Sequence, residues 1–157
     1  MSLPAKIEKT RKKLLGLTQR LSFLAPLLLR LTVGLTFVHT GWQHLAHLDK
    51  TIEAFTGWGV PMPELNARVA SATELFGGLA VLVGLGTRLA CLPLAFTMLV
   101  AIATAQKDEV DGLISFVSLN EWAYATIFLA LAVLGPGPVS LDAALARWLE
   151  RRASEHA

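Results

Sequence analysis

Four apolar runs, each of 17 to 23 residues, constrain the fold more than any other feature of the sequence. A helix needs about 20 residues to cross a hydrocarbon core of roughly 30 Å, so runs of this length are typical of membrane spans. A helix also satisfies its backbone hydrogen bonds within one segment, as a segment in lipid must. The sequence therefore predicts an all-α integral membrane protein, a bundle of four transmembrane helices at about residues 23–45, 66–85, 88–106 and 119–135.

The composition agrees with a membrane chain and excludes several other classes. Hydrophobic residues make up 54% of the 157 residues and charged residues 17%, whereas soluble domains carry about 25% charged residues. The net charge of +2 gives no reason to expect nucleic acid as a partner. Cys91 is the single cysteine, which excludes a disulfide scaffold and a CxxC redox pair. We interpret Cys91 as a small buried residue.

The residues between the runs indicate how the helices connect. Residues 84–87 form a tight turn, so the second and third helices should be antiparallel neighbours, and the Gly-Pro-Gly-Pro segment 135–138 ends the fourth. The long loop 47–65 is typical of a functional segment or lid, with one or two helical turns at 51–55. We place the start of the fourth helix at Leu119, after a solvated connection. A start at Gly112 would instead bury Asn120 and Glu121 about 12 Å deep.

Basic residues outside the spans predict the orientation of the chain. Ten lie on one side of the predicted bundle and three on the other, and the richer side faces the cytoplasm. The ten are Lys6, Lys9, Arg11, Lys12, Lys13, Arg20, Arg88, Arg147, Arg151 and Arg152, and the three are Lys50, Arg68 and Lys107. We therefore expect a bacterial-type inner membrane protein with both termini in the cytoplasm.

Both ends of the chain have amphipathic patterns. Residues 1–22 predict a basic surface helix, and residues 139–152 predict a second amphipathic helix with Ser140 as its N-cap. Such helices lie on a membrane whose anionic headgroups attract their basic side chains. The expected apolar residues are Ile7, Leu14, Leu17 and Leu21 in the first helix, and Leu141, Ala144, Leu145, Trp148 and Leu149 in the second.

Glu74 is the main functional candidate inside the predicted bundle. A charged side chain at membrane depth costs roughly 2.5–3.5 kcal/mol on insertion scales, which marks it as a candidate for function. Successive helical residues turn by about 100°, so Gly77 and Gly78 share the face of Glu74. Small residues let a second helix approach closely. Glu74 is therefore expected to point at protein and away from lipid.

Arg30 and His39 in the first predicted helix complete the candidate catalytic set. By depth, Glu74 falls between Arg30 on the inner side and His39 on the outer side. We predict that Arg30 pairs with Glu74 and sets its charge, and that His39 or Glu121 passes protons to the outer face. Two structural alternatives stay open. Glu74 could only lock two helices together, and Arg30 could reach the inner headgroups.

An apolar ligand between the first two helices would meet small residues and a few polar side chains. The candidate ligand-binding residues are Gly34, Gly41, Gly77, Gly78, Gln106 and Glu121. His44 and His47 lie one turn apart and are the candidates for a metal site, but no thiolate accompanies them. A cap of hydrogen bonds with Gln106, Asn120 and Glu121 is the preferred interpretation, so no metal is predicted.

Taken together, these residues resemble the DoxX family of small four-helix membrane proteins over roughly residues 23–145. The most specific match runs from Glu74, Gly77 and Gly78 to Thr87 and Arg88. The other matching segments are 29–37 with His39, Gly41 and Trp42, then 59–63, Asn120 with Glu121, and 134–142. The sequence departs from the family pattern at Asn120-Glu121-Trp122, which replaces the usual Gly-Tyr-Glu type of approach, and in its long basic N-terminus.

The resemblance implies two hypotheses and leaves open whether the chain is an enzyme. Some relatives look like subunits of thiosulfate:quinone oxidoreductases, and others associate with thiol and oxidative-stress enzymes. The first hypothesis is a subunit of a quinone-linked or thiol/sulfur-linked redox system, with a quinone beside Glu74. No haem, flavin or iron–sulfur motif is present, so a protein partner would supply the electrons. The alternative is a non-catalytic anchor, assembly factor or accessory subunit within a larger complex or homo-oligomer.

Overall fold

The computed structural model describes residues 8, 11–12, 15–16 and 18–155, and its regular structure is entirely helical over these residues. The predicted all-α class is confirmed. The elements in chain order are α2 (Leu24–Ala46), α3 (Leu48–Gly57), α4 (Pro63–Val83), α5 (Thr87–Thr104), the 3-10 turn η1 (Lys107–Glu109), α6 (Leu113–Ser118), α7 (Asn120–Leu134) and α8 (Leu141–Glu155). The surface helix predicted at 1–22 lies largely outside the described residues.

Several helix ends follow directly from local chemistry. The helix α4 begins at Pro63, three residues earlier than predicted, because proline suits the first helical position, where its missing N–H is not needed. Gly84 ends α4 with a left-handed backbone at φ 74°, a conformation that favours glycine. The helix α3 is longer than the one or two turns expected. The expected solvated connection before α7 contains η1 and α6.

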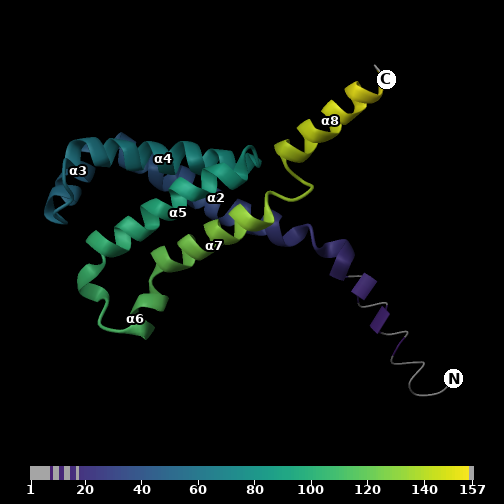
Figure 1. Cartoon of the computed structure of the whole chain (residues 1–157). Coiled ribbons are helices and arrows are strands. Elements are labelled where there is room, and N and C mark those ends of the chain that lie inside the picture. The colour runs from purple at the N-terminus through teal and green to yellow at the C-terminus, as the bar shows by residue number, and fades with distance from the viewer. Residues whose placement is uncertain (1–7, 9–10, 13–14, 17, 156–157) are drawn as a thin grey trace.

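The four long helices form two neighbouring pairs. The helix α2 packs along α4, and α5 packs along α7, while α4 contacts α5 and α2 contacts α7. Figure 1 shows α3 and α6 at one end of these helices and α8 leaving from the opposite end. The turn between α4 and α5 lies at the α8 end. This end is called the α8 end below, and the other is called the α3–α6 end.

Aromatic and aliphatic side chains from all four long helices form the core. The ring of Phe37 meets Tyr124 and Phe128 edge to face, with centroids 5.4 and 4.8 Å apart. Aromatic pairs prefer this arrangement. Cys91 is buried in the same core, as expected for a small apolar side chain. The buried core residues are Val33, Phe37, Val81, Cys91, Leu94, Ala95, Met98, Ala125, Phe128 and Leu131.

Glycines bring α2 and α4 into close antiparallel contact. A Cβ atom added at Gly34 would lie 2.8 Å from Leu82 Cα, and one added at Gly78 would lie 2.9 Å from the backbone nitrogen of Val38. A Cβ atom at Gly41 would meet the backbone of Leu75. Distances this short do not occur between real Cβ atoms and backbone, so only glycine permits the approach.

The outer faces of the helices carry large apolar side chains. Two helices in the described part of the chain, Thr18–Ala46 and Thr87–Thr104, are long and apolar enough to cross a membrane. The apolar helix α7 has 15 residues. Leu35, Phe76 and Leu89 are exposed on three different helices, as expected where lipid and not water surrounds the protein. The predicted four spans and their orientation stay predictions.

Replacing Gly41 by alanine should destabilise the protein because the new methyl group meets the backbone of α4, which cannot move aside easily. Overpacking of this kind typically costs about 1–3 kcal/mol, more than the helix propensity that alanine gains. The unfolding midpoint of Gly41→Ala, followed by circular dichroism in detergent, should fall below that of the wild type. Gly57→Ala in α3 is the matched control, since no atom lies within 4 Å of its added Cβ. Equal midpoints for the two variants would contradict this role of Gly41.

Candidate functional site

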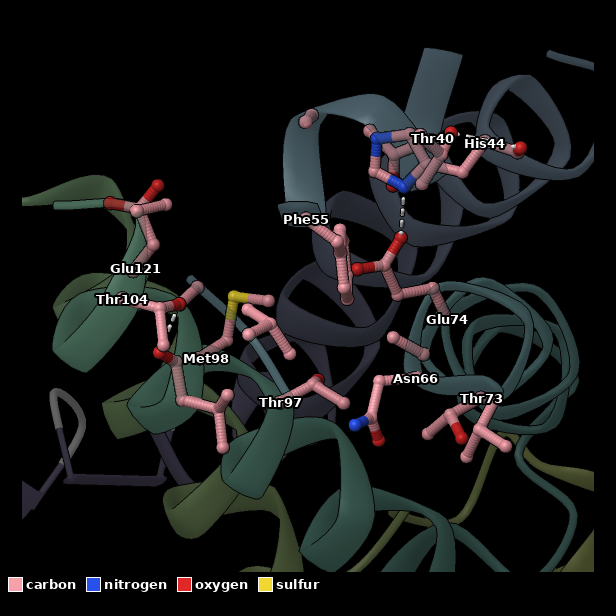
Figure 2. Close-up of a pocket in the computed structure, with 18 of the residues that line it drawn as sticks. Thr40, His44, Phe55, Asn66, Thr73, Glu74, Thr97, Met98, Thr104 and Glu121 are labelled. Carbon is pink, nitrogen blue, oxygen red and sulfur yellow. Dashed lines mark hydrogen bonds and ion pairs between the residues drawn. The ribbon is translucent and has the colours of Figure 1, made fainter. Parts of the chain in front are cut away.

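A cavity of about 970 Å³ lies between the α2–α4 and α5–α7 pairs, toward the α3–α6 end (Figure 2). The helix α3 and residues 58–61 contribute to its wall, so the long loop predicted to be functional does reach the site. Its side chains come from α2 (Thr36, Phe37, Thr40, Gln43, His44), from 47–61 (His47, Lys50, Thr51, Ala54, Phe55, Trp58, Val60, Pro61), from α4 (Asn66, Val69, Ala70, Thr73, Glu74), from 93–106 (Pro93, Phe96, Thr97, Met98, Val100, Ala101, Thr104, Ala105, Gln106) and from α7 (Glu121, Tyr124).

The strongest polar contact in this cavity joins His44 to Glu74. The Nδ1 atom of His44 lies 2.8 Å from Oε2 of Glu74, across the interface between α2 and α4. Glu74 is buried and His44 is half-exposed. A buried carboxylate needs such a partner, because leaving it unpaired costs several kcal/mol. The contact also orients the imidazole ring, since one ring nitrogen is held by the carboxylate.

A second polar pair lines the cavity from the α5–α7 side. Gln106 Nε2 donates a hydrogen bond of 3.0 Å to Glu121 Oε1. In Figure 2, Met98 and Phe55 lie between Glu121 and the His44–Glu74 pair. The cavity is thus a mainly apolar chamber with a hydrogen-bonded acid on each side.

Most hydroxyl groups in the chamber are already bonded within their own helices. Thr97 donates to the carbonyl of Leu94 and Thr104 to that of Val100, both at 2.8 Å. A threonine bonded in this way presents its methyl group and little free polarity. Most of the polar recognition in the chamber therefore falls to the two pairs that contain an acid.

Arg30 lies outside this cavity, near the α8 end. Its hydrogen bonds in the described part of the chain all go to backbone carbonyl groups. Its side chain is 2% exposed. It donates to the carbonyl oxygens of Val81 and Leu82 at the end of α4, both at 2.9 Å. It also donates to those of Pro136 at 2.8 Å and Val139 at 2.7 Å, after α7. A guanidinium suits the last turn of a helix, where carbonyl groups lack partners and the helix dipole is negative.

The predicted pairing of Arg30 with Glu74 is therefore wrong, and the reason is the register of the two helices. Gly34 contacts Leu82, whereas Gly41 contacts Glu74 and Leu75. Arg30 is 11 residues before Gly41 in α2, or about 16 Å along a helix axis at 1.5 Å per residue. It therefore reaches the end of α4 and not its middle. His44, three residues after Gly41 and on the same side of α2, reaches Glu74 instead.

The segment after α7 is tied to the turn between α4 and α5. The side chain of Asp142 accepts a hydrogen bond of 2.9 Å from the backbone N–H of Gly86. The backbone N–H of Asp142 donates to the carbonyl of Gly84 at 3.0 Å. Ser140 Oγ accepts a bond of 3.1 Å from the N–H of Ala143, which confirms Ser140 as the cap of α8.

The other predicted site residues are divided between the cavity and its surroundings. His39 is exposed and does not line the cavity. His47 lines it and bonds the carbonyl of Gln43 through Nδ1 at 3.1 Å. The described part of the chain holds no group of three or more His, Cys, Asp or Glu side chains suited to a metal ion. The glycines named as ligand contacts, Gly34, Gly41, Gly77 and Gly78, lie at helix contacts outside the cavity lining.

Sequence reasoning missed several residues of the cavity. Phe55, Trp58 and Tyr124 supply aromatic surface to it, and none of them was named as a candidate. The length of the loop 47–65 was the available signal for the first two. The sequence indicates His44 as a candidate for a metal site. Its spacing of three residues from Gly41 places it on the same side of α2, and this spacing was the available signal for its contact with Glu74.

Comparison with known proteins identifies relatives of this chain. The DoxX family model matches residues 25–107. "Inner membrane protein YphA" of Escherichia coli is 31% identical over 121 residues, which are 74% of this chain and 86% of the relative. The Bacillus subtilis protein named "Putative oxidoreductase CatD" is 33% identical over 112 residues, 67% of this chain and 82% of the relative. "Inner membrane protein YqjF" of Escherichia coli is 30% identical over 125 residues, 79% of this chain and 94% of the relative. No solved structure matches the chain.

Replacing Arg30 by lysine should destabilise the protein although the charge is kept. Lysine offers a point charge on a flexible stem and cannot repeat the planar arrangement that serves four carbonyl groups. Hydrogen bonds to charged groups contribute about 1.5–3 kcal/mol, so losing part of this set should lower the free energy of unfolding by about 2–4 kcal/mol. Denaturant titration in detergent measures this change. Arg20→Lys, at an exposed position, is the matched control. An Arg30→Lys variant as stable as Arg20→Lys would refute the structural role of Arg30.

Proposed function

The chain belongs to the DoxX family and is a membrane protein, and on this premise we propose that it is a subunit of a membrane redox system that binds a quinone-class carrier in the cavity. The observation that carries the proposal is the His44–Glu74 pair at the wall of an otherwise mainly apolar chamber. The Bacillus subtilis relative carries the name "Putative oxidoreductase CatD", which also supports a redox role.

The chamber suits a flat apolar molecule with a few oxygen atoms. Ligand sites are typically cavities of about 300–1,000 Å³, mostly apolar, with a small number of placed polar groups, and the volume of about 970 Å³ lies within this range. Phe55, Trp58 and Tyr124 offer aromatic surface to a ring. His44, Gln106 and the two acids supply hydrogen-bonding groups. A quinone head and part of its isoprenoid tail fit this set of residues.

The cavity lining includes exposed apolar residues on its α4–α5 side, which supports a ligand dissolved in lipid, and exposed polar residues toward the α3–α6 end, among them His47 and Lys50. Val69 of α4 and Phe96 of α5 both line the cavity, yet they are 54% and 66% exposed. Lining residues that are also exposed mark the mouth of a cavity. Because Val69 and Phe96 are apolar, the α4–α5 side favours entry from hydrocarbon over entry from water.

The His44–Glu74 pair can exchange a proton with a bound ligand. A quinone-class carrier supplies two-electron, two-proton chemistry when it is bound. Glu74 holds Nδ1 of His44, which leaves Nε2 as the ring nitrogen that can accept or return a proton. The carboxylate stabilises the imidazolium that forms, as an acid does when paired with a catalytic histidine.

The charge distribution supports a topology with four spans and the α8 end in the cytoplasm of the inner membrane. Arg20, Arg88, Arg147 and Arg151 lie toward the α8 end, and Lys50, Arg68 and Lys107 lie toward the α3–α6 end. The positive-inside rule then directs the α8 end to the cytoplasm. The cavity would face the outer half of the bilayer.

The electrons require a protein partner. Iron–sulfur clusters are held by several cysteines, and this chain has one, which is buried in the core. Because Cys91 is buried, a thiol-linked system would have to take its reactive thiol from the partner. The quinone-linked form of the hypothesis needs no such thiol and is therefore favoured. If the chain bound a protein partner but no ligand in the cavity, this result would support the alternative function, that of an accessory or anchoring subunit.

His44→Gln should weaken the binding of ubiquinone-1 by about tenfold or more, since one hydrogen bond to a charged pair contributes about 1.5–3 kcal/mol. The purified chain in nanodiscs would be titrated while the tryptophan fluorescence is recorded, because Trp58 lines the cavity and a quinone quenches it. Glu74→Gln should show the same loss, because it removes the carboxylate that orients the ring.

His39→Gln is the matched control, the same substitution on the same helix at an exposed position outside the cavity. Unfolding midpoints of all three variants separate loss of binding from loss of fold. If His39→Gln and His44→Gln bind ubiquinone-1 equally well, or if the wild type does not bind it, the proposed site is wrong.

A further inference from the structure

The C-terminal helix α8 carries an apolar face that nothing in the described chain covers. It runs from Leu141 to Glu155 without a buried residue. Four large apolar side chains on it are about half-exposed, and their spacing of three and four residues places them on one side of the helix. They are Leu141, Leu145, Trp148 and Leu149.

Two arginines accompany this apolar face. At about 100° per residue, Arg151 falls beside it, whereas Arg147 and Glu150 fall on the opposite side. Arg152 falls within the face, with its guanidinium 4.8 Å from the centre of the Trp148 ring. An arginine stacked on tryptophan keeps its charge at the polar edge of an apolar surface. This pattern is typical of a helix that lies in a lipid interface.

The position of α8 agrees with a membrane surface at this end of the protein. Figure 1 shows α8 leaving the bundle at the end opposite α3 and α6. Acidic side chains gather at the α3–α6 end, which makes the α8 end the one suited to an anionic surface. The acidic residues of the α3–α6 end are Asp49, Glu53, Glu64, Asp108, Glu109 and Asp111.

Hydrogen bonds hold the start of α8 at the level where the long helices end. The carboxylate of Asp142 is engaged by the backbone of Gly86, in the turn between α4 and α5. Arg30 holds the carbonyl groups of Pro136 and Val139 in the segment that leads to α8. The start of α8 is thus fixed at the boundary that the bundle shares with lipid.

We propose that α8 lies on the anionic lipid surface at the cytoplasmic side, with Leu145, Trp148 and Leu149 in the boundary between headgroups and acyl chains and Arg151 and Arg152 on lipid phosphates. The occupant of the apolar face is lipid. This inference does not depend on the quinone proposal, because it uses neither the cavity nor its residues.

Spin labels on opposite sides of α8 test the inference in the full chain. Leu145→Cys places a label on the apolar face, and Glu150→Cys is the matched control on the other side. The wild type is the labelling blank, because its only cysteine, Cys91, is buried. Collision with oxygen, which concentrates in lipid, is compared with collision with a water-soluble nickel chelate. Nanodiscs of phosphatidylcholine alone are compared with nanodiscs that contain about 30% phosphatidylglycerol.

With phosphatidylglycerol present, the ratio of oxygen to nickel collisions at position 145 should exceed that at position 150 by about threefold or more, as for a helix half in lipid. The difference should shrink in phosphatidylcholine alone and in the Arg151→Gln, Arg152→Gln double variant. Equal ratios at the two positions in both lipids would overturn the proposal. So would shielding of position 145 from both reagents regardless of lipid, which would indicate a protein partner or a second copy of the chain.

Discussion

The close antiparallel contact of α2 with α4 determines which partner the buried charged residues Arg30 and Glu74 each meet. Glycine at positions 34, 41 and 78 lets the two backbones approach to distances that a Cβ atom would not permit. This contact sets one register between the helices. In that register Arg30 meets the end of α4, and His44 meets Glu74 in its middle. Shifting α2 by one turn would leave Arg30 and Glu74 buried without these partners, at a cost of several kcal/mol each.

The register also places the structural residue of α2, Arg30, and the residue proposed for chemistry, His44, at opposite ends of the helix. Arg30 donates to four carbonyl groups and ties α4 to the segment before α8. Four of its five N–H donors are used in this way and the side chain is buried away from the cavity, so Arg30 holds the fold and is not placed to bind a ligand there. His44, at the other end of the helix, is half-exposed and borders the cavity. The acid beside it is the group that would stabilise its protonated form. The proposed chemistry therefore depends on the α3–α6 end, while the α8 end anchors the bundle.

Two surfaces of the protein agree with these separate roles: the outer faces of the long helices and the amphipathic face of α8. Exposed apolar side chains on the outer faces of the long helices favour lipid around the protein, and Val69 and Phe96 are both exposed and part of the cavity lining. The helix α8 adds an amphipathic face, which we propose lies on the lipid surface. On these two proposals, a small chain takes a ligand from the membrane and stays at a fixed depth in it, with a protein partner as the proposed source of electrons.

The sequence by itself determined the helical class, the family, the turns at Gly84 and at 135–138, the cap at Ser140, and the burial of Glu74 within the protein. These depend on local patterns of apolar residues, glycine and proline, which act through the chain near them. Only the tertiary structure decided that Glu74 binds His44 and not Arg30, and that α3 contributes to the wall of a cavity. Residue spacing predicts which side of a helix a residue occupies. It does not predict how far that helix slides along its neighbour, because the slide depends on which backbones approach most closely.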